Sequence, residues 1–420
     1  MKDRSFFSRI VLGLLVAATG VGAGDMITAS MAGSRTGLVL LWAAFAGALL
    51  KWVLNESLAR WQLATGNTLL EGWVAHLGRW IQWVFLLYLL LWSFAVGGAL
   101  INACGVAGAA MLPLGDPHTS KIIWGIAHSL VGFGLVWSGR FKAFEFAMSG
   151  LVALMVVAVL LNVILVSPSL GAIARGLFVP SIPRGQEAWL LGVLGGVGGT
   201  VTIMSYGYWI REKRRSGREG VKESRFDLAV AYGLTAFFGA AMIIIGSKVQ
   251  ISGKGATVAL VLANQLGAIL GPVGKWLFLL GFWGAVFTSL LGVWQGVPYL
   301  FADFLNLRRG RSLGRDQSVD IKRSMEYRAF LLALTVLPMS LLWFNVQQVQ
   351  LAYAVMGALF MPLVALTLLL LNNRRNLVGR GFRNSLAVKV LLVITLVFFS
   401  YLGAREILNI IRGLSPIVSG

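Results

Sequence analysis

Charged residues are scarce in this sequence, and acidic residues are the scarcest. Only 12% of its 420 residues are charged, and 16 Asp and Glu stand against 36 Lys and Arg. Cysteine is nearly absent too, and because Cys104 stands alone the chain cannot form an internal disulfide. Polar tracts and heptad repeats are missing, which excludes disordered and coiled-coil proteins. A soluble domain with 57% hydrophobic residues and a mean hydropathy of +0.79 would expose large apolar patches, so a soluble protein is excluded as well.

Apolar runs of about twenty residues recur along the whole chain, which is the length that crosses a bilayer as a helix. They predict an all-α integral membrane protein with one transporter domain over residues 1–420 and about eleven transmembrane helices. The predicted helices are 10–32, 37–59, 80–108, 121–137, 144–166, 188–210, 228–246, 271–304, 329–344, 351–371 and 388–411. The apolar segment 256–270 is too short to span comfortably, so we expect an interfacial helix there.

The formal net charge of +20 does not indicate nucleic-acid binding, because the cations lie in the loops between apolar runs. The two most basic loops span 211–225 and 308–328, and both fall on the same side of the predicted topology. The positive-inside rule therefore places the amino terminus in the cytoplasm and the carboxyl terminus outside, in a plasma (inner) membrane. Recognition of lipid head groups is an alternative reason for these basic loops.

Glycine interrupts two of the predicted helices, the first at 20–24 and the sixth at 192–199. Glycine costs about 1 kcal/mol relative to alanine inside a helix, so such clusters mark unwinding or close packing. Irregular backbone survives at membrane depth only where it is buried or lines a cavity. Two breaks five helices apart predict a 5+5 inverted repeat (10–166 and 188–371, plus an extra helix at 388–411) with the substrate between the breaks. Close glycine packing at helix crossings is the alternative.

A carboxylate, Asp25, lies in the first glycine cluster near the middle of its predicted helix. It costs about 2.5–3.5 kcal/mol there, and no Lys or Arg lies within a helical turn or two along the chain. A bound cation would neutralise it, with further oxygen ligands from the backbone near Gly22 and Val201 and from Thr28. The thioether of Met204 in the sixth helix would favour a softer transition metal over Mg²⁺ or Ca²⁺. A protonated Asp and a packing Met are the alternatives.

Four more polar side chains in the predicted helices are secondary candidates: Gln295, Gln348, Tyr206 and His128. The glutamines could supply oxygen ligands, although hydrogen bonding between helices explains them equally well. A histidine can shuttle protons near neutral pH, but an interior histidine whose hydrogen bonds are satisfied is the simpler interpretation. No motif of a zinc protease, a phosphate-binding loop or a serine nucleophile is present, so no enzyme activity and no cofactor are expected.

Four short segments carry a resemblance to a known family. They read AGSRTG and LLW within 32–42, LARW and TG within 58–71, RFD at 225–227, and FMPL and NRR within 360–379. In this order they resemble the natural resistance-associated macrophage protein (Nramp) family of divalent-metal transporters. The resemblance implies a leucine-transporter-like fold and alternating-access transport of Mn²⁺ or Fe²⁺, which is a substrate and not a cofactor.

The resemblance also identifies where this chain departs from the family. The family's first helix carries Asp-Pro-Gly-Asn, whose Asp and Asn bind the metal, and the ungapped match here is Gly22 to Asp25. A gapped match would put Asp25 on the family's Asp, so one carboxylate remains in either case. The family's metal-binding Met precedes Pro-His, whereas Ser205 and Tyr206 follow Met204. The missing His and a third predicted helix without acidic residues argue against proton coupling.

Two other functions fit the same sequence features. The cargo could be an amino acid or another small organic solute, whose amine would suit Asp25. The chain could instead be a metal sensor that does not transport, because a fold does not fix a function. Competition by amino acids would identify the first alternative, and saturable binding without flux would identify the second.

Overall fold

In the part of the chain that it describes, the computed structural model consists of helices joined by turns and loops, with no strand. It describes residue 22, 24–139, 150, 169–196, 201–212, 215–250, 257–309, 321–379, 381–419 and scattered positions in 153–164. The first half contains the π-helix η1 (Gly24–Thr28), α2 (Ala29–Thr36), α3 (Leu41–Thr65), α4 (Leu69–His76), α5 (Arg79–Met111), α6 (Pro117–Ser138), α8 (Leu170–Phe178), α9 (Glu187–Gly196) and α10 (Thr202–Glu212). The second half contains α11 (Gly217–Gly246), α12 (Val258–Arg308), the 3₁₀ helix η2 (Ile321–Arg323), α13 (Met325–Val336), the 3₁₀ helix η3 (Leu337–Trp343), α14 (Val346–Ala358), α15 (Phe360–Asn372), α16 (Leu386–Ile411) and α17 (Pro416–Ser419).

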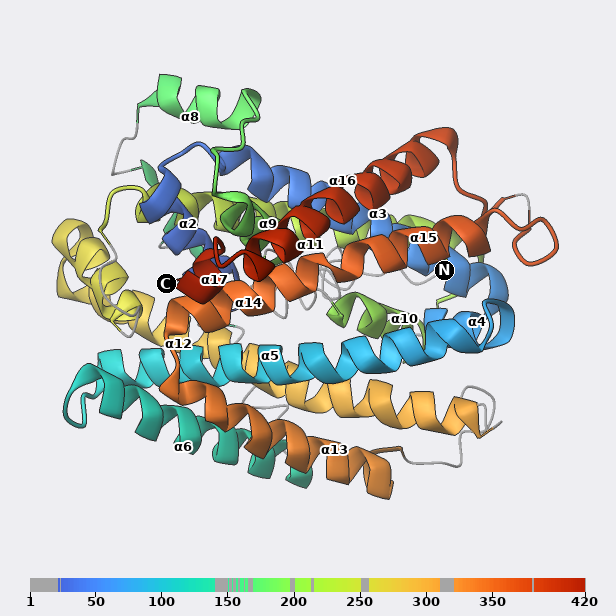
Figure 1. The fold of residues 1–420 in the computed structure, drawn as a ribbon, viewed down its shortest axis with the longest axis horizontal. Coiled ribbons are helices and arrows are strands. Elements are labelled where there is room, and N and C mark those ends of the chain that lie inside the picture. The colour runs from blue at the N-terminus through green and yellow to red at the C-terminus, as the bar shows by residue number, and fades with distance from the viewer. Residues whose placement is uncertain are drawn as a thin grey trace, which may run out of the picture.

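The long helices run roughly alongside one another (Figure 1). In the described part of the chain, seven helical stretches are long and apolar enough to cross a membrane. They match the third, fourth and seventh to eleventh predicted helices. The second, α3, carries Lys51, Asn55 and Glu56 within its apolar sequence, and the sixth is divided into two short helices. The predicted helices 10–32 and 144–166 fall largely outside the described residues, so the total of eleven stays a prediction.

Three local features refine the boundaries expected from sequence. The short helix α8 was not predicted. The apolar segment before residue 271 is helical as expected, and Gly271 turns the chain into the long helix that follows, with a φ of 70° that favours glycine. The ninth helix tightens into the 3₁₀ helix η3, where Pro338 removes a backbone donor. Whether 257–270 lies at a membrane surface stays a prediction.

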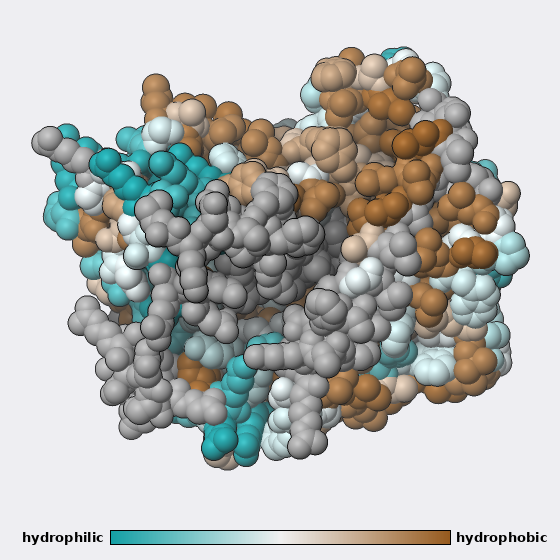
Figure 2. All heavy atoms as spheres, turned by 180° about the vertical axis from the view of Figure 1, so that it is seen from behind, coloured by the Kyte–Doolittle hydropathy of each residue, from teal (hydrophilic) through white to brown (hydrophobic). Residues whose placement is uncertain are grey.

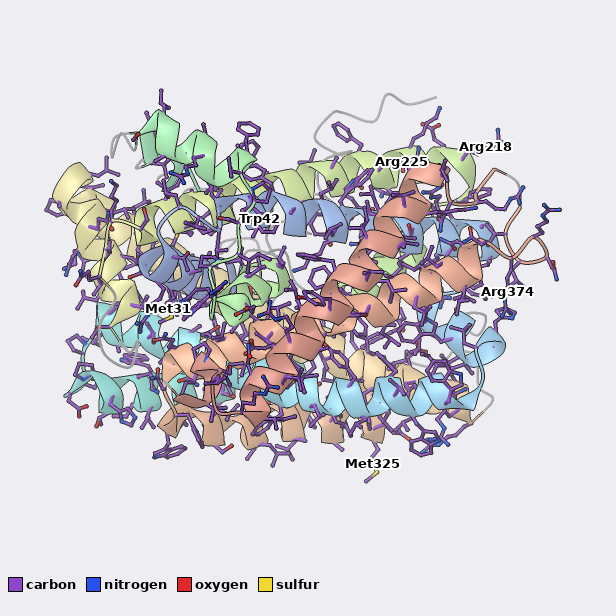
Figure 3. The ribbon with its side chains drawn as sticks, turned by 45° about the horizontal axis from the view of Figure 1, so that its top comes forward. Met31, Trp42, Arg218, Arg225, Met325 and Arg374 are labelled. Atoms are coloured by element: carbon purple, nitrogen blue, oxygen red, sulfur yellow. The ribbon has the colours of Figure 1, made fainter. Side chains whose placement is uncertain are left out.

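The outer surface is apolar, as a lipid-facing surface must be. Along α16 the exposed side chains include Val390, Val393, Ile394, Val397 and Ile411. Figure 2 shows large hydrophobic areas on one face, with hydrophilic side chains gathered toward the side that lies at the right of Figure 1. Arg218, Arg225 and Arg374 lie at that end, whereas Met31 and Trp42 lie toward the other (Figure 3). Cations thus concentrate at one end of the helices.

Glycine brings two helices into backbone contact where α2 crosses α11. A Cβ added at Gly33 would lie 2.1 Å from the carbonyl oxygen of Ile243. A Cβ added at Gly246 would lie 2.1 Å from the carbonyl oxygen of Ser30. The alternative role considered for the glycines, close packing at crossings, therefore applies at these two positions, and it also applies within the second predicted break, where a Cβ added at Gly195 would lie 2.1 Å from a carbonyl oxygen of α14.

Candidate functional site

A π-helix, η1, begins at Gly24, the last glycine of the first predicted break, and leads directly into α2, whereas residues 20, 21 and 23 lie outside the described part. Such segments are rare and occur mostly within helices near functional sites. Gly22 is buried just before it, and the carbonyl oxygen of Gly22 accepts a 3.1 Å hydrogen bond from the backbone N–H of Met26. The backbone of Asp25 lies within η1, but its side chain lies outside what the structure describes, so the position of its carboxylate stays a prediction.

The sixth predicted helix consists of two helices, α9 and α10. All ten residues of α9 are buried, so this helix contacts protein on every side. Val201 lies in a turn just before α10, and its carbonyl oxygen accepts a 2.9 Å hydrogen bond from the backbone N–H of Met204. The side chain of Met204 is buried. The break was predicted at 192–199, but α9 stays helical through Gly196 and α10 begins at Thr202, while residues 197–200 lie outside the described part.

The long helix α12 contacts both broken segments through one face. A Cβ added at Gly22 would lie 2.8 Å from Ser289 Oγ, so the start of the first break lies against α12. The Ser205 Oγ would lie 3.5 Å from a Cβ added at Gly296, so the start of α10 lies against α12 as well. Ser289 and Gly296 are two helical turns apart on the same face. The points at which α12 contacts Gly22 and Ser205, the residue after Met204, are therefore about 10 Å apart along the axis of α12.

Thr28 connects the first break to α9. Its side chain is buried, and its Cγ2 would lie 3.0 Å from a Cβ added at Gly192. Its Oγ1 has no hydrogen-bond partner among the described residues. A buried hydroxyl without a partner costs about 1–3 kcal/mol, so this oxygen suits a ligand that the structure does not contain. Leu351 of α14 contacts the same glycine, which encloses the site from a third side.

A lysine that was not among the predicted site residues also lies at the break. Lys51, in the middle of α3, is completely buried, and its Nζ donates a 2.9 Å hydrogen bond to the carbonyl oxygen of Gly195 at the end of α9. The sequence contained a signal for it, because an ionisable residue within a membrane helix is rare and usually functional. No Lys or Arg lies close to Asp25 along the sequence. The fold nevertheless brings a cation, Lys51 of α3, to the end of α9, where the break in the sixth predicted helix begins.

His128 makes a hydrogen bond through each ring nitrogen. Its Nδ1 lies 2.7 Å from the carbonyl oxygen of Trp124, and its Nε2 accepts a 2.7 Å hydrogen bond from Trp283 Nε1. The carbonyl requires a donor and the indole N–H requires an acceptor, so the ring is neutral with its proton on Nδ1. The geometry favours the structural interpretation of this residue over a proton shuttle.

The three other secondary candidates lie at different distances from the breaks. Gln295 is half-buried and precedes Gly296, beside the contact between α12 and α10. Gln348 lies one turn before Leu351 on the same face of α14. The hydroxyl of Tyr206 accepts a 3.2 Å hydrogen bond from Arg215, which directs it toward the far end of α10.

The carboxyl-terminal half of α10, which lies away from the break, forms hydrogen bonds and an ion pair with neighbouring helices. Tyr208 Oη donates a 2.5 Å hydrogen bond to Asp303 of α12, and Arg211 forms a 2.6 Å ion pair with Glu71 of α4. Gln62 of α3 donates to the carbonyl oxygen of Gly207. Only the first residues of α10 therefore face the break, while the rest of the helix is held by polar contacts.

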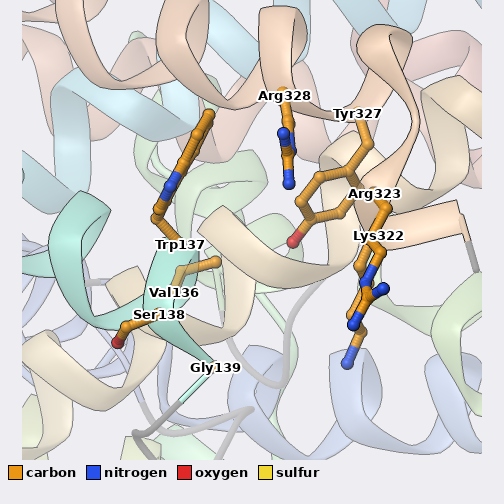
Figure 4. Close-up of a pocket in the computed structure, with 8 residues that line it drawn as sticks. All are labelled: Val136, Trp137, Ser138, Gly139, Lys322, Arg323, Tyr327 and Arg328. Atoms are coloured by element: carbon orange, nitrogen blue, oxygen red, sulfur yellow. The ribbon is translucent and has the colours of Figure 1, made fainter.

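A separate cavity of about 250 Å³ lies between the end of α6 and the start of α13 (Figure 4). It is lined by Val136, Trp137, Ser138, Gly139, Lys322, Arg323, Tyr327 and Arg328. The guanidinium of Arg328 stacks on Trp137 at 4.8 Å. None of the predicted metal-site residues lines this cavity.

Comparisons with solved structures find the same fold in several transporters. A manganese transporter of Eremococcus coleocola superposes with a TM-score of 0.72 over 98% of this chain and 89% of that one, at 19% identity. The inward-facing conformation of Mhp1 gives a TM-score of 0.59 at 13% identity, over 98% of this chain and 93% of that one. MhsT in complex with L-phenylalanine gives 0.56 at 15% identity, over 95% and 98%. These likenesses confirm the predicted fold class of broken-helix transporters.

Sequence comparison identifies the family. No curated protein sequence matches the chain. Residues 13–409, which include both broken segments, α3 to α15 and most of α16, match the family described as natural resistance-associated macrophage protein-like. The resemblance noted from four short segments is thereby confirmed over almost the whole length, and the chain belongs to the Nramp family.

Proposed function

We propose that this protein is a secondary transporter that carries divalent transition-metal ions such as Mn²⁺ or Fe²⁺ across a membrane by alternating access. The observation that carries the proposal is the meeting of two broken helices on one face of α12, next to the unpartnered buried hydroxyl of Thr28. Membership of the Nramp family and the likeness to a manganese transporter support the choice of cargo.

In this proposal five residues hold the ion between the breaks. Asp25 supplies the charged ligand and Met204 the soft one, which favours Mn²⁺ over Mg²⁺. The carbonyl oxygens of Gly22 and Val201 and the hydroxyl of Thr28 supply neutral oxygen ligands. The carbonyl oxygen of Val201 accepts one backbone hydrogen bond, from Met204, and a carbonyl oxygen has two lone pairs.

Alternating access would move one inverted repeat against the other, with the repeats at 10–166 and 188–371 and the extra helix at 388–411 outside them. We place the amino terminus and the arginine-rich end of the helices in the cytoplasm, because the cations gather at that end. The carboxyl terminus would then lie outside.

The test of the proposed function is Mn²⁺ uptake into proteoliposomes loaded with a metal-sensitive dye. Asp25→Ala and Asp25→Asn should abolish uptake, because the ion loses its one charged ligand. Glu219→Gln is the matched control, since Glu219 is an exposed acid outside the breaks and should be dispensable. Uptake that persists in both Asp25 variants would refute this site.

The same uptake assay in proteoliposomes distinguishes this proposal from two alternatives, an organic solute as the cargo and a metal sensor. The fold shared with MhsT keeps an organic solute open as the cargo. Amino acids that compete with Mn²⁺ uptake would favour that alternative. Saturable Mn²⁺ binding without any flux would instead favour a metal sensor.

We also propose that anionic lipid head groups contact the basic cavity between α6 and α13. Three cations, Lys322, Arg323 and Arg328, line it beside Trp137, a residue type that anchors helices at membrane interfaces. Arg328→Gln should weaken retention of phosphatidylglycerol relative to phosphatidylcholine in mass spectra of the intact protein. Equal retention in wild type and variant would refute lipid binding at this cavity.

A further inference from the structure

Lys51 is one of two buried lysines in the described part of the chain, and the only one of the two that contacts a broken helix. It lies at the centre of α3, with none of its surface exposed, and the side chains of Leu50, Val53 and Leu54 around it are buried too. A lysine in such a position is costly, so it persists only with a compensating partner. Its Nζ donates to the carbonyl oxygen of Gly195 at 2.9 Å.

That carbonyl belongs to the last turn of α9, which ends at Gly196. The last carbonyl groups of a helix lack partners within the helix and carry the negative end of its dipole. A cation is therefore stabilised there, and the break begins directly beyond it. Gly192, one turn earlier on α9, is the residue against which Thr28 packs. The Lys51 ammonium and the unpartnered Thr28 hydroxyl thus approach successive turns of the same buried helix.

We propose that Lys51 is a resident cation of the transport site that weakens binding of the transported dication. This inference rests on the proposed function of the same site. Inside a protein the repulsion between an ammonium and a dication decays slowly with distance, because the surroundings screen it poorly. A site with one carboxylate and one lysine has little net charge, so it holds a divalent ion loosely. Loose binding is useful in a transporter, because the ion must leave as well as enter.

The experiment measures Mn²⁺ affinity by titration calorimetry on purified wild type and on Lys51→Gln. Glutamine keeps a donor for the Gly195 carbonyl and removes the charge. The Kd for Mn²⁺ should fall on the order of a hundredfold, the size expected for removing a unit charge about 10 Å from a dication at an effective dielectric constant near 20. A gain in affinity is informative because damage to the fold weakens binding. An unchanged or higher Kd in folded Lys51→Gln would overturn the inference.

The matched control is Lys121→Gln. Lys121 is equally buried, and its Nζ donates hydrogen bonds to the carbonyl oxygens of Leu342 and Phe344 at 2.6 and 3.2 Å, at the end of η3 and away from both breaks. Its loss should lower thermal stability and leave the Kd for Mn²⁺ unchanged. An equal gain in affinity in both variants would show a general effect of removing buried charge and would overturn the specific role of Lys51.

Charge dependence gives a second readout that a structural role would not produce. Tl⁺ carries half the charge of Mn²⁺, so Lys51→Gln should change its log Kd by about half as much. Equal changes for both ions would contradict an electrostatic origin.

If Lys51→Gln cannot be purified, saturable binding of radioactive manganese to membrane vesicles gives the Kd, because only folded protein binds. Wild type that binds no Mn²⁺ would refute the proposed function itself, whereas normal Mn²⁺ binding unaffected by Lys51→Gln would refute only this inference.

Discussion

The hydroxyl of Tyr208 donates a hydrogen bond to the carboxylate of Asp303 at 2.5 Å, which joins α10 to α12 beyond the break. The ion pair between Arg211 and Glu71 joins the same end of α10 to α4. Both contacts lie one to three turns beyond Thr202, where α10 begins. Movement of α10 against its neighbours therefore requires these polar contacts to break.

We expect Tyr208→Phe to loosen α10 and make the start of this helix more accessible. Loss of a hydrogen bond to a charged group is worth about 1.5–3 kcal/mol, which corresponds to at least a tenfold change in an opening equilibrium. The measurement is the rate of maleimide labelling of Ser205→Cys, with Cys104 as a buried and slow background. Tyr327→Phe is the control, since Tyr327 lies on α13 at the separate cavity. Equal labelling rates with and without Tyr208→Phe would contradict the role of this contact.

Met204→Leu tests the soft ligand. Leucine keeps the volume of the buried side chain, so the cost in stability should stay below about 1.5 kcal/mol. The preference for Mn²⁺ over Mg²⁺ should fall, because only the thioether favours the softer ion. Competition titrations of both ions give the ratio of the Kd values. Met242→Leu, at another buried methionine in α11, should leave that ratio unchanged, and an unchanged ratio in Met204→Leu would remove Met204 from the site.

His128→Phe tests the interpretation that this histidine is structural. The variant removes the hydrogen bond from Trp283 Nε1 to the His128 ring, which should lower the free energy of unfolding by about 1–3 kcal/mol. The pH dependence of Mn²⁺ uptake should not change. The double variant His128→Phe/Trp283→Phe should be destabilised by less than the sum of the two single variants, because both remove the same contact. A shifted pH profile would instead show that His128 carries a proton.

Two glycines of α11 should respond in opposite ways to alanine. Gly246→Ala puts a methyl group against the Ser30 carbonyl, and we expect a loss of about 1–3 kcal/mol from overpacking. Gly233 has open space at the corresponding position, so Gly233→Ala should stabilise the helix by about 0.5–1 kcal/mol. Thermal unfolding in detergent compares the two. Equal effects would mean that the close approach of α2 and α11 does not limit this position.

Much of the fold was predictable because a bilayer imposes a length. A helix that crosses hydrocarbon needs about twenty apolar residues, so the runs at 80–108 and 388–411 predicted α5 and α16 closely. The breaks were also predictable, since glycine clusters are costly inside a helix. The helix α8 was missed because it is short and carries no span-length apolar run.

The site was predictable only in part. The sequence selected Met204, Val201, Gly22 and Thr28, and the fold places them on or beside the two breaks. The sequence did not predict that Lys51 lies next to the break in the sixth helix. It also did not predict that Ser289 and Gly296 form the face of α12 that contacts both broken segments.

The sequence by itself determined that the chain is a membrane protein with two glycine-broken helices, because hydrophobic length and backbone flexibility are local properties. Only the tertiary structure decided which groups meet at the breaks. Lys51 and Gly195 are 144 residues apart, and Trp283 lies 155 residues from His128. Such partners are chosen by the packing of whole helices, since a buried polar group takes whichever donor or acceptor that packing places within about 3 Å.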